Sequence, residues 1–165
     1  MVINFIIILI SGEIQAKYLL EYEFDIANLN IDRTKPKIEL LEITNSSAKN
    51  KEIANKDDIV KVKIKITDKN LKDIFLNEEY LNVNVDDEIV KDSSIKIYKL
   101  ENISDGEIYQ IELKKIEGNG FLKLNILEGA VIDKGELKSE LLEIDTNILI
   151  ENDKDFNEKI IDKTY

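Results

Sequence analysis

The stretch Gly118–Glu136 reads Gly-Asn-Gly-Phe-Leu-Lys-Leu-Asn-Ile-Leu-Glu-Gly-Ala-Val-Ile-Asp-Lys-Gly-Glu. Its run 121–126 has the two-residue period of a half-buried strand, with Leu122, Leu124 and Ile126 on one face and Phe121, Lys123 and Asn125 on the other. Glycines flank this run, and glycine supplies the positive φ angles that tight reversals need. The stretch therefore predicts a turn, a strand, a second turn at Glu128-Gly129 and a third at Asp133-Lys134-Gly135.

The same alternation recurs along most of the chain. Residues 59–67 are the clearest case, since Val60, Val62, Ile64 and Ile66 alternate with Lys61, Lys63 and Lys65. Further strand-like runs occupy residues 38–43, 71–76, 81–86, 95–100, 108–116 and 140–150. Polar turn signals separate these runs about every 8–12 residues, a spacing typical of sandwiches. The pattern predicts an all-β fold, an antiparallel β-sandwich of about seven to eight strands.

Length and charge narrow the classes of protein that fit. The chain has 165 residues, 43% of them hydrophobic, which is enough for one domain with a real core and some additional chain. Asp and Glu number 34 against 23 Lys and Arg, so the net charge is −11 and the pI is near 4.6. Nucleic-acid binding needs a basic surface, and this composition argues against it.

Three residue types are absent: histidine, cysteine and tryptophan. Without cysteine the chain can form no disulfide, no thiolate nucleophile and no thiolate-bound zinc. Without histidine it has no Ser-His-Asp triad and no side chain whose unperturbed pKa lies near neutrality. The composition therefore predicts that the protein is not an enzyme, and it suggests no organic cofactor.

Residues 1–30 allow two interpretations. The apolar run 1–10 followed by Ile14-Gln15-Ala16 resembles a signal peptide or anchor, although no Lys or Arg precedes it and it is too short to span a bilayer. Alternatively, residues 5–14 resemble residues 121–131, which suggests an internal repeat and the last strands of a truncated upstream module.

The segment Asp32-Arg33-Thr34-Lys35-Pro36 contains the only proline and predicts a short, stiff connector. The expected organisation is an upstream remnant or signal over residues 1–34, the sandwich over residues 35–151, and a charged tail or linker over residues 152–165.

Four motifs together resemble the tandem Ig-like repeats of large bacterial cell-surface proteins. They are Asp-x-Thr-x-Pro at 32–36, Thr-Asp-Lys-Asn-Leu at 67–71, Gly-Asn-Gly-Phe-Leu at 118–122 and Glu-Gly-Ala-Val-Ile-Asp-Lys-Gly at 128–135. The resemblance covers residues 31–152. Two positions depart from the family pattern, since Arg33 and Glu136 stand where asparagine is usual.

The resemblance implies an Ig-like sandwich that is extracellular, at the cell surface or secreted. It implies a non-catalytic spacer or adhesion module whose partners are neighbouring repeats and an extracellular protein or glycan. An alternative is an accessory carbohydrate- or protein-binding module of a secreted multidomain enzyme. Neither reading involves nucleic acid or a stable membrane span.

Acidic turns are the candidate sites. Asp32, Asp68 and Asp133 could gather at one end of the sandwich and bind calcium, which takes about 6–8 oxygen ligands. The competing interpretation is that each carboxylate caps its own turn. Asp86-Asp87-Glu88 is expected to be a solvated turn rather than a catalytic carboxylate pair. The tyrosines Tyr80, Tyr98 and Tyr109 are expected to pack in the core or across strands.

Overall fold

The computed structural model describes residues 33–48 and 50–153. Residues 1–30, interpreted either as a signal or as a repeat remnant, lie outside these ranges. The candidate ligand Asp32 and most of the expected tail also lie outside them. The strands within them are β1 (Lys37–Asn45), β2 (Ile53–Ala54), β3 (Val60–Thr67), β4 (Leu71–Ile74), β5 (Leu81–Val85), β6 (Glu88–Ile89), β7 (Ser94–Ile103), β8 (Gly106–Lys114), β9 (Gly120–Ile126), β10 (Val131–Asp133) and β11 (Leu142–Ile150). A single 3-10 turn, η1 (Glu78–Tyr80), is the one helical element of the described part.

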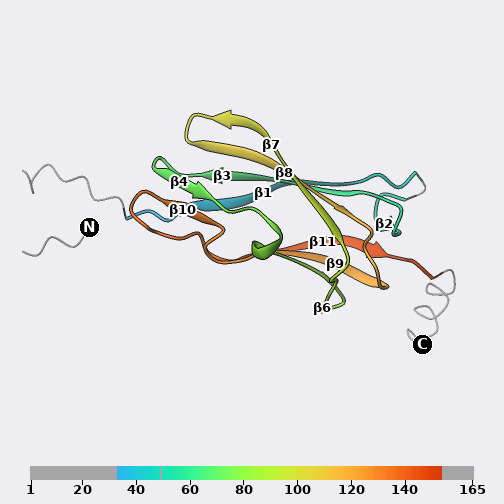
Figure 1. The fold of residues 1–165 in the computed structure, drawn as a ribbon. Helices are drawn as coiled ribbons and strands as arrows, with labels where there is room; N and C mark the ends of the chain where they lie inside the picture. The colour runs from blue at the N-terminus through green and yellow to red at the C-terminus, as the bar shows by residue number, and fades with distance from the viewer. Residues whose placement is uncertain (1–32, 49, 154–165) are drawn as a thin grey trace, which may run out of the picture. The chain divides into compact units, whose positions relative to one another are not determined.

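The strands form two main sheets (Figure 1). One has the order β1-β3-β8-β7 and the other the order β2-β11-β9-β5-β6, while β10 and β4 make a separate pair. All pairings are antiparallel except β2 with β11. In the letters used for immunoglobulin-like sandwiches, β1-β3-β8-β7 corresponds to A-B-E-D, β11-β9-β5 corresponds to G-F-C, and β6 is an added C′ strand. The strand order is therefore that of an immunoglobulin-like sandwich. The predicted all-β antiparallel sandwich is confirmed.

The strand count differs from the prediction for a simple reason. Seven strands have five or more residues, and these seven together with β4 correspond to the eight runs that the alternating pattern indicated. The other four, β2, β4, β6 and β10, have between two and four residues each. The strands β2, β6 and β10 are too short to show a period, so only their backbone pairing identifies them.

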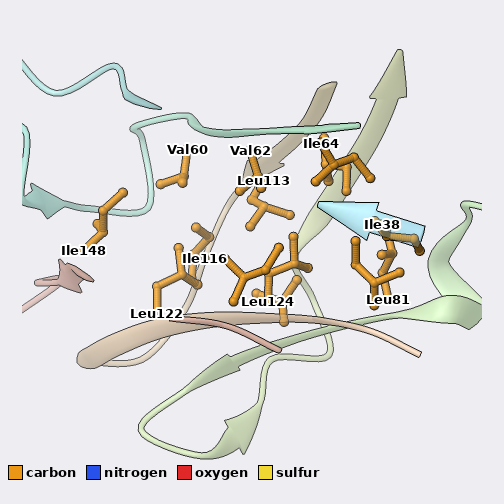
Figure 2. Packing of buried hydrophobic residues seen from close by; sticks show 14 of the residues in the cluster. Ile38, Val60, Val62, Ile64, Leu81, Leu113, Ile116, Leu122, Leu124 and Ile148 are labelled. Carbon is orange, nitrogen blue, oxygen red and sulfur yellow. The ribbon is translucent and has the colours of Figure 1, made fainter. Parts of the chain in front are cut away.

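The core lies between the two main sheets. Every second residue of β3, from Val60 to Ile66, is fully buried, while the lysines between them face outward. Leu122 and Leu124 of β9 meet this row from the opposite sheet (Figure 2). Burying an aliphatic side chain of this size stabilises the fold by about 1.5–3 kcal/mol. The predicted in-and-out pattern of residues 59–67 and 121–126 is confirmed.

The chain enters the sandwich at one end and leaves it at the other. Lys35, before β1, forms an ion pair of 2.9 Å with Glu140, before β11. At the far ends of these strands, Asn45 donates a hydrogen bond to the carbonyl of Ile53, which is paired with Leu149. β1 and β11 therefore run in the same direction, each over nine residues or about 30 Å at a strand rise of about 3.3 Å per residue. Figure 1 shows the start of β1 and the end of β11 on opposite sides of the domain.

Both edges of the four-stranded sheet are irregular. The β1–β3 register shifts between Leu40 and Glu42, so Leu41 bulges out of the ladder. The β7–β8 register shifts between Lys99 and Glu101, so Leu100 does the same on the other edge. Such bulges interrupt the regular row of backbone groups that an edge strand presents.

Candidate functional site

The acidic turns at the entry end lie against one another. Asp68 Oδ1 accepts a hydrogen bond from the backbone N–H of Asn70 at 2.5 Å, and the Asn70 carbonyl accepts one from the N–H of Lys134 at 2.8 Å. Asp133 is paired with Leu71 across the β10–β4 ladder. The structure thus brings the turns of Asp68 and Asp133 together at this end of the sandwich.

Asp133 holds its own turn. Its side chain is fully buried, and Oδ1 accepts a hydrogen bond of 2.8 Å from the N–H of Leu137. Its backbone N–H donates to the Leu137 carbonyl at 3.1 Å, and its carbonyl accepts from the N–H of Glu136 at 3.2 Å. Oδ2 is buried without a hydrogen-bond partner among the residues that the structure describes. The carboxylate therefore closes the 133–137 reversal, which is the capping role expected for it.

The calcium hypothesis gains no third ligand from the described residues. Asp32 lies outside them, and within residues 33–48 and 50–153 no group of three or more acidic side chains is arranged to hold a metal ion. Asp68 and Asp133 each serve a backbone turn through one carboxylate oxygen. Calcium binding at these residues stays a prediction.

At the exit end, three polar residues clamp the departing chain. Asn152 donates from Nδ2 to the carbonyls of Ile116 at 3.0 Å and Gly118 at 2.7 Å, and its Oδ1 accepts from the N–H of Lys56 at 2.7 Å. Asn119 Oδ1 accepts from the backbone N–H of Asn152 at 2.7 Å. We call this set, with Asp153, the exit clamp.

Asp153 completes the clamp. Its backbone N–H donates to Asn119 Oδ1 at 3.1 Å, and its carboxylate accepts from Asn119 Nδ2 at 3.1 Å. Local sequence patterns do not predict this cluster, because its two asparagines are separated by 33 residues. The Gly-Asn-Gly motif at 118–120 indicates a turn there but not the partner of its asparagine.

Asp86 and Asp87 form the turn between β5 and β6, Glu88 begins β6, and all three residues are exposed. Asp86 and Asp87 have φ angles of 47° and 67°, the left-handed pair that suits a tight hairpin. Asp86 Oδ1 also accepts from the N–H of Phe121 at 2.8 Å, and Asp87 pairs with Lys123 at 2.7 Å. These carboxylates therefore attach the β5–β6 turn to the neighbouring strand β9.

A hollow of about 480 Å³ opens beside this turn, and it is lined in part by four carboxylates, Asp86, Glu88, Asp92 and Glu117. All four side chains are exposed to solvent. In a catalytic carboxylate pair, the two groups lie in unlike and partly dry environments that separate their pKa values. The four exposed carboxylates of this hollow are arranged differently.

The three candidate tyrosines differ in how they pack. Tyr80 stacks on Phe75 with ring centroids 5.9 Å apart. The hydroxyl of Tyr109 donates to Glu107 at 2.6 Å, and burial followed by this hydrogen bond raises the pKa of Tyr109 far above its ordinary value. These two agree with the expected packing. Tyr98 does not, since it faces outward on the edge strand β7 and is 42% exposed.

The outer face of the four-stranded sheet carries a charge network centred on Glu112. Its carboxylate lies 3.3 Å from both Lys61 and Lys114, and it accepts a hydrogen bond of 3.1 Å from Gln110. Burial opposes ionisation of Glu112, yet the hydrogen bonds from Lys114 and Lys61 hold its pKa below the ordinary value of 4.5. This network accommodates Lys61, the first of the alternating lysines of β3.

One large aromatic side chain stands on the outer face of the five-stranded sheet. Phe121 lies on the central strand β9 and is 56% exposed. Its neighbours on that face include Leu149, paired with it on β11, and Lys123, two residues along β9. Across the β9–β5 ladder, Lys123 lies opposite Asn84. The face thus combines an exposed ring with hydrogen-bonding side chains.

Across the described part of the chain, no helix has the length and apolarity needed to cross a membrane. Neither a protein-family model nor a curated protein nor a solved structure matches this chain.

Proposed function

We propose that this protein is a non-catalytic spacer and adhesion module that works in a tandem array of Ig-like domains on the outside of a cell. The observation that carries the proposal is the path of the chain, which enters the sandwich beside Glu140 and leaves it beside Asn119 at the opposite end. A domain threaded in this way adds its full length to any array, since its neighbours attach at opposite ends. A domain with adjacent termini would instead hang from the array as a side branch.

The contacts at both ends support a stiff rather than a loose connection. At the entry, Lys35 pairs with Glu140, and Pro36 restricts the residue before it to extended conformations. At the exit, the clamp ties Asn152 and Asp153 to the 116–119 loop and to Lys56. A chain held on several sides leaves the domain in one direction.

Small-angle scattering tests the proposal. Two copies of residues 33–153 joined directly should form an elongated particle about twice as long as one copy, because a stiff junction cannot fold back as a flexible linker would. The change Asn152→Ala in the first copy should broaden the distance distribution by freeing the junction. A compact pair in which the two domains lie side by side would overturn the proposal, provided that a single copy unfolds cooperatively.

One observation favours the second candidate, an accessory module that binds carbohydrate. Phe121 offers an exposed ring on a central strand, and sugar rings stack on aromatic faces while their hydroxyls bond to amide and charged groups. Lys123, two residues along β9 from Phe121 and paired with Asp87, supplies a charged group on the same face.

Electrophoresis of the full chain in native gels cast with mannan, xylan or a mixed β-glucan tests this candidate. Retardation by one polymer should be lost in Phe121→Ala and kept in Tyr98→Ala, a matched change of an exposed aromatic on the other sheet. Equal migration of the unmodified chain in all three gels would remove the carbohydrate candidate.

A further inference from the structure

We propose that the outer face of the four-stranded sheet binds a carboxylated polysaccharide. The site consists of Lys63, Lys96, Tyr98 and Gln110. The inference rests on the proposed function only for the extracellular setting, and its site lies on the opposite sheet from Phe121. A chain with a net charge of −11 has few surfaces that an anionic partner can approach, so the place where its lysines gather is informative.

Lysines outnumber carboxylates at the centre of this face. Glu112 on the inner strand β8 lies opposite Lys61 on β3 and opposite Lys96 on β7. Lys114 is 3.3 Å from the same carboxylate, and Lys63 lies two residues along β3 from Lys61. Although burial opposes its ionisation, the hydrogen bonds from two lysines hold the pKa of Glu112 below its ordinary value, so it carries one negative charge at neutral pH. Four lysines around one carboxylate leave an excess of three positive charges.

Two of these lysines are open to a partner. Glu112 already engages the other two, each at 3.3 Å. Lys63 and Lys96 take part in none of the ion pairs found among the described residues, although Glu42 lies opposite Lys63 across the β1–β3 ladder. Their ammonium groups are therefore the ones that a carboxylate from outside the chain would meet.

Gln110 lies between the open lysines on the inner strand β8. It is paired with Lys63 on one side and with Tyr98 on the other, so these three residues form a row across the sheet. Neighbouring strands are about 4.8 Å apart, which places Lys63 and Tyr98 about 10 Å from one another. Lys96 lies two residues along β7 from Tyr98, or about 7 Å. Two cations, an amide and an aromatic ring thus share one patch of the sheet.

Each part of this patch matches a feature of an acidic sugar. The ammonium groups match carboxylates, which recur along an acidic polysaccharide. Tyr98 is 42% exposed and offers a ring face on which a sugar ring can stack. Gln110 donates from Nε2 to Glu112 at 3.1 Å and keeps its amide oxygen to accept from a sugar hydroxyl. An acidic peptide would use only the lysines, and a nucleic acid would bring a dense row of phosphates against a largely acidic protein.

Isothermal titration calorimetry of the full chain with polygalacturonate, in calcium-free buffer, tests the proposal. The same polymer with its carboxylates fully methyl-esterified is the matched control, because it keeps the sugar rings and removes the charge. We expect binding to polygalacturonate alone, with an affinity that falls as added salt screens the lysine charges. Absence of binding at low ionic strength, or equal binding of the esterified polymer, would overturn the proposal. Tighter binding to polyglutamate would also overturn it and assign the face to an acidic protein.

Substitutions of exposed side chains locate the site. Lys63→Gln and Lys96→Gln should each weaken binding about two- to fivefold, the range expected for one exposed ion pair. Tyr98→Ala should weaken it about two- to tenfold through the loss of stacking, whereas Phe121→Ala on the other sheet should leave it unchanged. Lys134→Gln removes the same charge from an exposed turn at the entry end and is the matched control. An equal loss in Lys134→Gln would show attraction to the chain as a whole and would overturn the site.

The outcome is independent of the scattering experiment. An elongated tandem that binds no polygalacturonate would retain the spacer and remove the polysaccharide site. A compact tandem that binds it through Lys63 and Lys96 would remove the spacer and retain the site.

Discussion

Asn152 allows a sharp test of the exit clamp, because replacement by aspartate changes its hydrogen-bonding groups with almost no change in shape. Nδ2 donates to two carbonyls, those of Ile116 and Gly118, while Oδ1 accepts from the N–H of Lys56. Asn152→Asp keeps the acceptor and replaces the donor by a carboxylate oxygen. Two hydrogen bonds are lost, each worth about 1 kcal/mol net, and the new charge faces two carbonyl oxygens.

Urea unfolding at pH 7 should therefore show a loss of about 2–3 kcal/mol for Asn152→Asp, as two bonds at about 1 kcal/mol each plus repulsion predict. Asn152→Ala loses all three bonds but adds no charge, and water can replace part of them, so its loss should be about 1–2 kcal/mol. The aspartate variant is thus expected to be the less stable of the two, although it is closer to asparagine in shape.

The pH dependence of the aspartate variant provides a second check. Two carbonyl oxygens disfavour the charged form, so the pKa of the introduced carboxyl should be higher in the folded than in the unfolded chain. A raised folded pKa means that the destabilisation is present above that pKa and is relieved as the pH falls through it, because the protonated acid can donate again. A loss below about 0.5 kcal/mol at pH 7, within the range of an ordinary surface substitution, would refute the clamp as described.

Four further outcomes are expected. Gly129 has a φ of +81°, so Gly129→Val should destabilise the domain by about 1–3 kcal/mol in thermal unfolding, and an unchanged midpoint would remove the turn argument. Glu136 has a φ of +64°, so Glu136→Asn should raise stability by about 0.5–1 kcal/mol, while Glu136→Gln, which keeps the strain, should not. Folding lowers the pKa of Glu112, so its contribution to the free energy of unfolding should be present above the unfolded pKa and lost as the pH falls through the folded pKa. Glu112→Gln should therefore flatten the pH dependence of the urea-measured stability below pH 4.5. An unaltered pH profile would contradict this. Asp68 and Asp133 each serve a backbone turn, so the turn-capping interpretation predicts that millimolar calcium leaves the melting temperature unchanged, whereas the calcium hypothesis predicts a rise of several degrees.

Side-chain periodicity predicts the parts of this fold in which one face of a strand is buried. The rows from Val60 to Ile66 and from Leu122 to Ile126 alternate without interruption, and the structure buries them as expected. The pattern weakens at Leu100, where a bulge shifts the register and changes which side chains face the core. Local periodicity contains no information on such a shift.

Local patterns do not predict the exit clamp or the β2–β11 pairing, for a different reason. Both depend on contacts between residues far apart in the chain, such as Asn119 with Asn152 and Glu52 with Leu149. The turn at Asp133 was predictable because its hydrogen bonds connect residues within four positions of one another. Sequence reasoning thus located the self-contained turns and missed the polar contacts that join distant segments.

The bulges at Leu41 and Leu100 acquire a meaning in the proposed array. Covalently linked neighbours present the same strand edges to one another at an effective concentration in the millimolar range. Regular edges at that concentration would favour strand exchange between modules and fused, misfolded sheets. The two bulges, with Lys96 and Lys99 along β7, make the edges of the four-stranded sheet poor templates for a further strand. Near-identical modules can therefore be repeated along one polypeptide while each still folds by itself.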